Sequence, residues 1–407
     1  MTLDLAKVSP QLREMGRSLL DRHEAQAARR AYGIALLHRW ADRWEELRDL
    51  AERRERRQRL ASPREPLNTA VDLPLLPADH RVVATDGSQI EPDRHGPAEF
   101  YLVNVGWSAL RYGPEPDAEL ASEPTLAYEL EELFILDDEG RRRVPVQGSH
   151  LAARRAVMEL ERAVALGEAF DDGQPLVILQ DGTLLLWVLE ERPEDFLRDA
   201  FLRPYVAALR QCQALGRPLA SYISRPRSTE VATLLRSATC DGATDACHPC
   251  ASAAAPVGLP RRGRTVLPSR PICALDGLHD RFFFEWLAVG QRSAIFATTL
   301  NRSIEAYYGD QRIHFFFLNV GSEIARIEIP AWVAADEDAL ALVQAVVYDQ
   351  CRRGQGYPAA LTRAHEQAIV RGADRRMVRL LLDSMFSQQG LRAQLSQKES
   401  AKRVRAV

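Results

Sequence analysis

The feature that most constrains the fold is the alternation of short apolar runs with one amphipathic helical pattern. Val157, Leu160 and Val164 recur on one face of that pattern, over 149–169. The apolar runs that we expect to form strands are 81–85, 99–107, 133–136 and 176–179. Because strands and helices alternate, an all-α or all-β protein is excluded. We expect an α/β fold with a mixed sheet flanked by helices.

The other segments suggest a helical arm, a central region and a polar tail. A helix is expected over 9–62, with Ser9 as its N-cap and Pro10 at its first position. The remaining expected elements are a hairpin over 313–330 and helices over 192–217, 336–353 and 358–387. The expected domains are the arm and linker 1–79, the α/β domain 80–387 with a cysteine-containing insertion at about 183–270, and the tail 388–407.

Two Asp-Gly motifs are the sharpest candidates for chemistry. Asp86 begins Asp-Gly-Ser and Asp181 begins Asp-Gly-Thr, each directly after an apolar run. Two carboxylates at the ends of neighbouring strands can hold divalent cations through their oxygens. Asp-Gly is also a common turn dipeptide, so either motif alone favours a plain turn. The pair, in this strand order, favours a metal site.

A third acid is expected on the helix between the two aspartate strands. Glu159 and Glu161 both border its apolar face, and the spacing does not choose between them. An aspartate on a strand, a glutamate on a helix and an aspartate on a second strand follow the order of acids in ribonuclease-H-like nucleases. There, paired metal ions stabilise the attacking and leaving oxygens of a phosphodiester.

The segment 356–382 offers further polar candidates. Tyr357 precedes a helical pattern, and His365 lies two turns into it. A lone helix histidine is most often structural, but beside a carboxylate cluster it can hold a metal, position water or orient phosphate. The arginines form either a solvated face or a contact surface for DNA phosphates. The candidates for DNA contact are Arg363, Arg371 and Arg375.

Composition excludes some classes of protein. Lysine occurs only at positions 7, 398 and 402, so no Gly-Lys-Ser/Thr loop exists and the chain is not a P-loop ATPase. No Gly-Gly pair occurs, which disfavours the alternative of an actin-like or sugar-kinase-like phosphotransferase. The net charge of −3 restricts nucleic-acid binding to a local patch. No run of 18 apolar residues and no secretion signal is found, so we expect a cytoplasmic protein without membrane attachment.

Four cysteines cluster in the second half of the chain. Cys-x2-Cys is half of a tetrahedral zinc site, and two further thiolates could complete it. The first spacing, with six intervening residues, is wider than usual and favours reduced thiols without metal. The four residues are Cys240, Cys247, Cys250 and Cys273.

Several of these stretches together resemble the NurA nuclease family, over about 80–387. They are VVATDGSQI, RRAVMELERA, LVILQDGTLL, CALDGLHDRFFFEWLAVGQRSAIF, FFFLNVGSEIARIEIPAW and GYPAALTRAHEQAIVRGAD. The resemblance implies a ribonuclease-H-like fold and Mn²⁺-dependent 5′-to-3′ DNA exonuclease and single-strand endonuclease activity. It also implies a homodimer that works with a HerA-type hexameric ATPase in DNA end resection for double-strand break repair. The missing Walker A lysine agrees with a motor on a separate chain.

The resemblance also implies site residues. Asp86 and Asp181 match the metal-binding aspartates, and Glu159 matches the helix acid better than Glu161 does. Tyr357 and His365 match the family's C-terminal tyrosine and histidine, with His365 as a further metal ligand. One or two Mn²⁺ ions are expected, with Mg²⁺ as a substitute. A non-catalytic DNA-processing subunit stays as an alternative, and the choice between repair and phage defence stays open.

Overall fold

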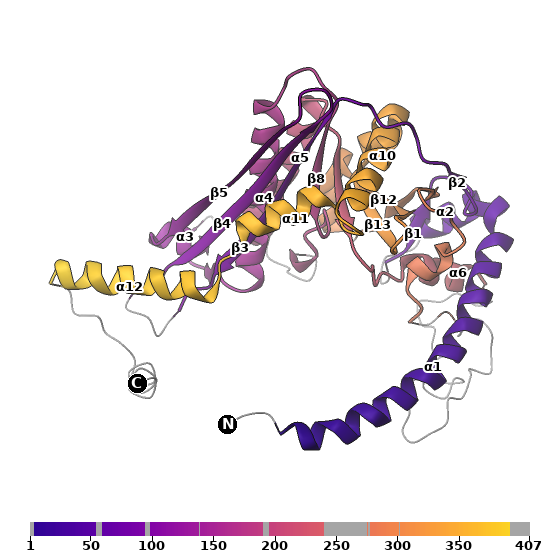
Figure 1. The fold of residues 1–407 in the computed structure, drawn as a ribbon, viewed down its shortest axis with the longest axis horizontal. Helices are drawn as coiled ribbons and strands as arrows, with labels where there is room; N and C mark the ends of the chain where they lie inside the picture. Colours follow the sequence, from indigo (N-terminus) through magenta and orange to yellow (C-terminus); the bar gives the residue numbers. More distant parts are fainter. Residues whose placement is uncertain are drawn as a thin grey trace. The chain divides into compact units, whose positions relative to one another are not determined.

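Two compact units make up the chain in the computed structural model (Figure 1). Unit 1 comprises Met1–Leu73, Ser224–Asn301 and His314–Ile327, and unit 2 comprises Pro74–Ile223, Arg302–Ile313 and Glu328–Val407. The structure describes residues 4–53, 59–93, 98–137, 139–189, 195–239, 275, 277–300 and 302–390. Among these, no helix has the length and apolar character that crossing a bilayer requires.

The core of unit 2 is a mixed sheet with the strand order β5-β4-β3-β8-β9. β3, β4 and β5 form an antiparallel meander, and β8 and β9 continue it in parallel. The strands are β3 His80–Ile90, β4 Tyr101–Tyr112, β5 Asp117–Ala127, β8 Leu176–Asp181 and β9 Leu219–Ile223. Part of the segment expected as an insertion thus supplies β9 to this sheet. The expected mixed α/β fold is confirmed.

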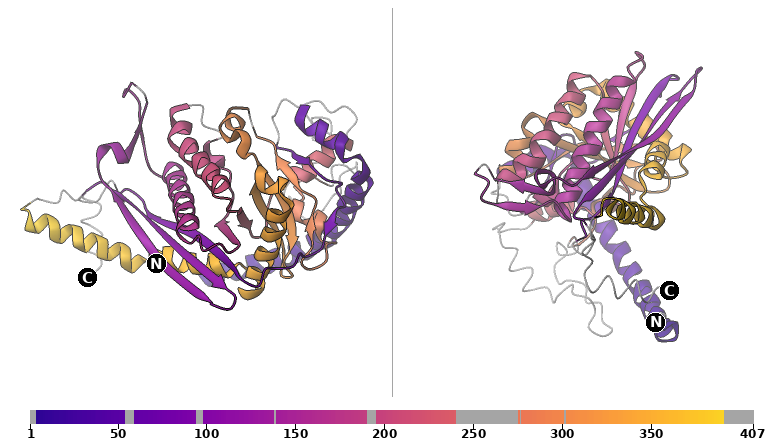
Figure 2. Two further views of the ribbon diagram at one scale, coloured as in Figure 1. Left: turned by 90° about the horizontal axis from the view of Figure 1, so that it is seen from above. Right: turned by 90° about the vertical axis from the view of Figure 1, so that its left-hand side faces the viewer.

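Helices cover both faces of this sheet (Figure 2). α4 and α5 lie on one face and α11 on the other. The helices are α3 Leu130–Leu133, α4 Ser149–Ala169, α5 Asp195–Ala214, α8 Arg302–Tyr308, α9 Ala331–Ala335, α10 Glu337–Arg353, α11 Ala359–Ala368 and α12 Gly372–Gln388. The 3-10 turns are η2 Trp187–Leu189 and η5 Gly309–Gln311, and a small separate sheet pairs β6 Phe134–Leu136 with β7 Arg143–Pro145.

α4 is the helix that the sequence predicts best. Its bounds agree with the expectation, and Val157, Leu160 and Val164 are all buried. Each such side chain contributes about 1.5–3 kcal/mol when it is fully buried. The period of these residues fixes which face of α4 meets the sheet, and therefore which residues border that face.

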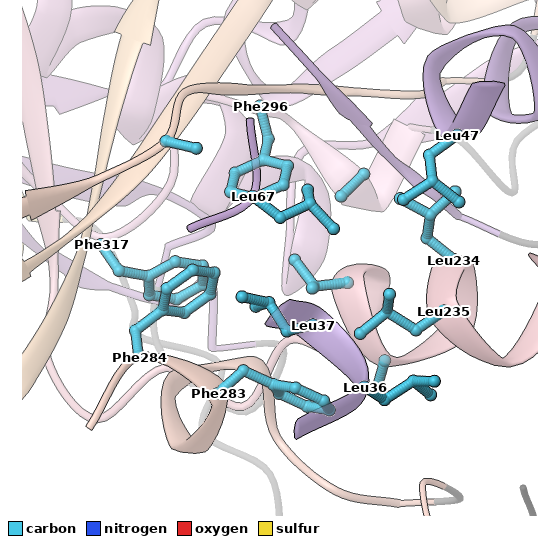
Figure 3. Packing of buried hydrophobic residues seen from close by; sticks show 14 of the residues in the cluster. Leu36, Leu37, Leu47, Leu67, Leu234, Leu235, Phe283, Phe284, Phe296 and Phe317 are labelled. Atoms are coloured by element: carbon cyan, nitrogen blue, oxygen red, sulfur yellow. The ribbon is translucent and has the colours of Figure 1, made fainter. Parts of the chain in front are cut away.

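Unit 1 has its own apolar core, to which helix and strand residues contribute (Figure 3). Leu36 and Leu37 at the end of α1 pack with Phe283 and Phe284. At Gly33 a Cβ atom would lie 2.7 Å from the Phe283 ring, so glycine permits this close packing. The elements are α1 Leu5–Arg39, η1 Ala41–Arg43, α2 Trp44–Arg53, β1 Ala61–Pro63, β2 Ala70–Val71, α6 Glu230–Thr239, η4 Asp280–Phe284, β10 Arg292–Ser293, β11 Phe296–Thr298, β12 Ile313–Asn319 and β13 Ile324–Pro330. The first residue of β12 and the last three of β13 are assigned to unit 2.

The expected helix over 9–62 is wrong at both ends. α1 begins at Leu5, where the Asp4 side chain accepts a hydrogen bond from Ala6 N, and it ends at Arg39. The backbone N–H of Trp40 then donates to Leu36 and Leu37, a tight turn that separates α1 from α2. β1 begins at Ala61 because it pairs with β11.

Three expectations within unit 2 also need correction. β3 does not end at Asp86 but runs to Ile90, because β4 pairs with it along its whole length. The third strand of the meander is β5, whereas 134–136 belongs to the small separate sheet. The helix expected over 358–387 is broken into α11 and α12 at Ile369, which has an extended ψ of 123°.

Candidate active site

The two motif aspartates lie next to each other in unit 2. The parallel register of β3 and β8 pairs Thr85 with Gln180, so Asp86 and Asp181 each follow one residue later on neighbouring strands. β8 ends at Asp181, whereas β3 continues beside β4. The β8 side of β3 is therefore open from Asp86 onward, at the carboxyl end of the parallel strands. Ligands of open α/β sheets commonly bind at this edge.

Glu159 reaches the same place from α4. Thr85 Oγ1 donates to the backbone carbonyl of Glu159 at 2.9 Å, which fixes this turn of α4 over β3. Glycine at position 87 leaves room for these side chains, because a Cβ atom would collide with Glu159 Oε1 and lie 2.8 Å from Arg155 Cγ. Glu161 is exposed on the same helix and, in contrast, does not contact the aspartates.

His365 is brought to Asp86 by the close approach of α11 to β4. Asp86 pairs with Gly106 in β4, and a Cβ atom at Gly106 would lie 2.7 Å from the carbonyl oxygen of Ala364. Without a side chain at that position, α11 rests directly on the strand. His365 Nδ1 then lies 2.6 Å from Asp86 Oδ2. Since a carboxylate only accepts, the Nδ1–H donates, so in the neutral imidazole the lone pair lies on Nε2.

Tyr357 reaches Asp181 from the tight turn between α10 and α11. Its hydroxyl donates to Asp181 Oδ1 at 2.7 Å. The turn passes through Gln355 and Gly356 with φ values of 57° and 116°, a left-handed path that favours glycine at the second position. The ring of Tyr222 packs edge-on against the Tyr357 ring at 5.3 Å. Tyr357 is thus held at both its ring and its hydroxyl.

The electrostatics of the three acids are unfavourable. Burial raises the pKa of Glu159 to about 8, Arg155 opposes this shift, and the charges of Asp86 and Asp181 add to it. Burial also raises the pKa of Asp181, against the hydrogen bond from Tyr357. Burial raises the pKa of the Tyr357 hydroxyl, and the neighbouring Asp181 charge raises it further. Carboxyl groups whose pKa is raised by burial and by neighbouring charges, as for Glu159 and Asp181, are typical of functional sites.

Each acid has a protein partner of its own. Asp86 bonds His365, Asp181 bonds Tyr357, and Glu159 Oε1 lies 3.0 Å from Arg155 Nε. Within the described ranges, no three His, Cys, Asp or Glu side chains are arranged as the ligands of one metal ion.

The donor set nevertheless fits a hard divalent cation. Glu159 Oε1 is buried and contacts Arg155 Nε as an ion pair, with no further hydrogen bond among the described residues. Carboxylate oxygens are the ligands that Mg²⁺ and Mn²⁺ prefer. A cation between the three acids would offset the burial that chiefly raises the pKa of Glu159, and would also neutralise the added repulsion from Asp86 and Asp181.

The three arginines predicted to contact DNA make their described contacts away from the three acids. Arg363, on α11, pairs with the exposed Glu366 at 2.7 Å. Arg375, on α12, donates to the carbonyl of Gln89 at 2.9 Å, and Arg371 directly precedes α12. The four cysteines considered as either reduced thiols or zinc ligands, Cys240, Cys247, Cys250 and Cys273, lie outside the described residues.

Sequence reasoning missed the residues that hold this constellation in place. Arg155 pairs with Glu159 four residues on, and Ser88 and Asn104 both bond the carbonyl of Ala368 at the end of α11. Thr183, the third residue of the second motif, donates to the buried carboxylate of Glu328 at 2.8 Å. In the sequence, these supporting roles are indicated only by the hydroxyl residue, Ser88 or Thr183, that ends each Asp-Gly motif.

Comparisons with known proteins give the family of the chain. The fold and the acids define an α/β protein with three carboxylates gathered at the end of its parallel strands. The NurA domain model matches residues 80–370, and the chain belongs to the NurA family of nuclease domains. A solved crystal structure of NurA with manganese is similar to this chain, at 11% sequence identity and with a TM-score of 0.35. The aligned part covers 78% of this chain and 91% of the NurA chain. Comparison with curated proteins gives no match.

Proposed function

We propose that this protein is a metal-dependent deoxyribonuclease that hydrolyses phosphodiester bonds of DNA. One observation carries the proposal. Asp86, Glu159 and Asp181 meet at the open edge of β3, and the two aspartates are bonded to the histidine and tyrosine that the family resemblance singles out. This arrangement joins a set of oxygen ligands with two groups that can hold or move a proton.

Asp86, Glu159 and Asp181 would hold one or two Mn²⁺ ions, or Mg²⁺, with His365 as a further ligand. When bound, the metal supplies charge neutralisation for the phosphate and acidifies water for attack. Tyr357 holds the Asp181 carboxylate in one orientation through its hydroxyl. Asp86 fixes the Nδ1–H tautomer of His365, which leaves Nε2 free to accept a proton or bind a cation.

We further propose that cleavage combines 5′-to-3′ exonuclease and single-strand endonuclease activity in DNA end resection. A homodimer would work with a HerA-type hexameric ATPase on a separate chain. The family resemblance supports this role, and the absence of a Gly-Lys-Ser/Thr loop is consistent with an external motor. The exposed guanidinium of Arg363 is available for DNA phosphates on the same helix as His365.

The test uses purified protein, Mn²⁺ and DNA without ATP. Substrates blocked at the 5′ or 3′ end report polarity, and circular single strands report endonuclease activity. Asp86→Asn removes a ligand charge and should lower the rate at least 100-fold. Glu366→Gln, one residue beyond His365 and paired only with surface Arg363 in the contacts above, is the matched control and should keep the wild-type rate. Equal rates in Asp86→Asn and wild type would overturn the proposal.

A further inference from the structure

The C-terminal end of α11 is held by two side chains of the sheet. Ser88 Oγ donates to the carbonyl of Ala368 at 2.5 Å and accepts from the N–H of Val370 at 3.1 Å. Asn104 Nδ2 donates to the carbonyls of Ala368 and Gln367 at 2.9 and 3.1 Å. The last carbonyls of a helix have no partner within the helix. Ser88 and Asn104 therefore complete this helix end and explain why α11 stops here.

These contacts lie within one helical turn of His365. Residues two apart on a strand point to the same face, so Asp86 and Ser88 both face α11. Asp86 accepts from His365, and Ser88 bonds Ala368, three residues further along the helix. The segment of β3 from Asp86 to Ser88 thus holds this turn of α11 twice, at the His365 side chain and at the backbone carbonyl of Ala368.

Placement of the backbone matters because the His365 side chain has little else to hold it. Its imidazole is 63% exposed, and the hydrogen bond to Asp86 is the contact that holds the ring. An exposed side chain keeps much rotamer freedom. A shift of about 1 Å in a catalytic group can cost about 100-fold in rate. The turn that carries His365 must therefore be fixed by other residues.

We propose that Ser88, together with Asn104, is a positioning residue that fixes the turn of α11 carrying His365 and so maintains the bond between His365 and Asp86. This inference rests on the proposed nuclease function and deepens it. It gives the serine of Asp-Gly-Ser a role in the site that a plain turn would not require.

The first test compares Ser88→Ala with Ser108→Ala. Ser108 is buried on β4 and donates to the carbonyl of Ala360 at 2.8 Å, in the first turn of the same helix. Both variants lose one serine-to-carbonyl bond, and Ser88→Ala also loses the bond that Ser88 accepts from Val370, so its melting temperature should fall at least as far as that of Ser108→Ala. Only Ser88→Ala should lower kcat, by about 10–100-fold with KM for DNA unchanged, as is typical when a group that orients a ligand is lost. Ser88→Thr keeps the hydroxyl and should restore most of the rate.

The second test does not need nuclease activity. In metal-free protein with ¹⁵N-labelled histidine, the His365 Nδ1–H resonance, assigned by its loss in His365→Asn, reports the bond to Asp86. It should be present in wild type and Ser108→Ala and be lost in Ser88→Ala. If wild type cuts no DNA, the proposed function fails and this resonance still decides the role of Ser88. An unchanged resonance in Ser88→Ala, or equal losses of rate in Ser88→Ala and Ser108→Ala, would overturn the inference.

Discussion

Replacing Glu159 with glutamine should stabilise the metal-free protein while abolishing its nuclease activity. The Glu159 side chain is only 12% exposed, and its pKa is raised from 4.5 to about 8. A carboxyl whose pKa is raised in the folded state destabilises the fold as pH rises above the unfolded pKa. Below pH 4.5 the effect is absent, and it grows until about pH 8. At pH 7 the difference of 2.5 pH units corresponds to about 3 kcal/mol as an upper bound.

Urea denaturation in EDTA at pH 4.5 and pH 8 measures this effect. Glu159→Gln, which cannot ionise, should match wild type to within about 0.5 kcal/mol at the lower pH and exceed it by up to about 4 kcal/mol at the higher pH. Glu161→Gln is the matched control, because Glu161 lies two residues away on the exposed side of α4. It should keep both the nuclease rate and most of the wild-type pH dependence. A Glu159→Gln protein that is less stable than wild type at pH 8 would refute the reasoning.

Two further substitutions probe how the site is held. Tyr357→Phe removes the hydroxyl that bonds Asp181 but keeps the ring against Tyr222. The cleavage rate should fall about 10–100-fold, while the melting temperature changes by a few degrees at most. An unchanged rate would count against a role for the hydrogen bond between Tyr357 and Asp181. Gly106→Ala places a Cβ atom 2.6 Å from the carbonyl carbon of Gln367, so it should cost at least about 1–3 kcal/mol of unfolding free energy and weaken cleavage. Gly372→Ala, with only Arg376 Nη1 nearby at 3.7 Å, is its control and should not destabilise; equal thermal shifts in the two variants would contradict the close packing of α11 on β4.

Local periodicity accounts for the elements that the sequence predicts well. α4 shows the 3.6-residue period of a helix with one buried face, and β8 is a continuous apolar run because it is buried on both sides. Both elements carry their own signal. The position of Asp181 at the end of a strand could therefore be predicted, whereas the helix period left Glu159 and Glu161 as alternatives.

Other elements depend on contacts that no local pattern contains. β5 is an edge strand whose residues are mostly exposed, so DAELASEPTLA has no apolar alternation. β3 continues through an Asp-Gly pair that favours a turn, because pairing with β4 keeps it extended. The break after Ala368 depends on Ser88 and Asn104, more than 260 residues away in the chain.

The central claim is that Asp86, Glu159 and Asp181 form one metal-dependent hydrolytic site. The most direct measurement determines Mn²⁺ bound per chain and the rate of DNA cleavage on the same preparation, for wild type and Asp181→Asn, with Asp171→Asn on the loop before β8 as control. Wild type and Asp171→Asn should bind Mn²⁺ and cut DNA without ATP, whereas Asp181→Asn should lose at least 100-fold in rate and bind Mn²⁺ more weakly while it stays folded. Cleavage by wild type in excess EDTA, or by folded Asp181→Asn at the wild-type rate, would contradict the claim.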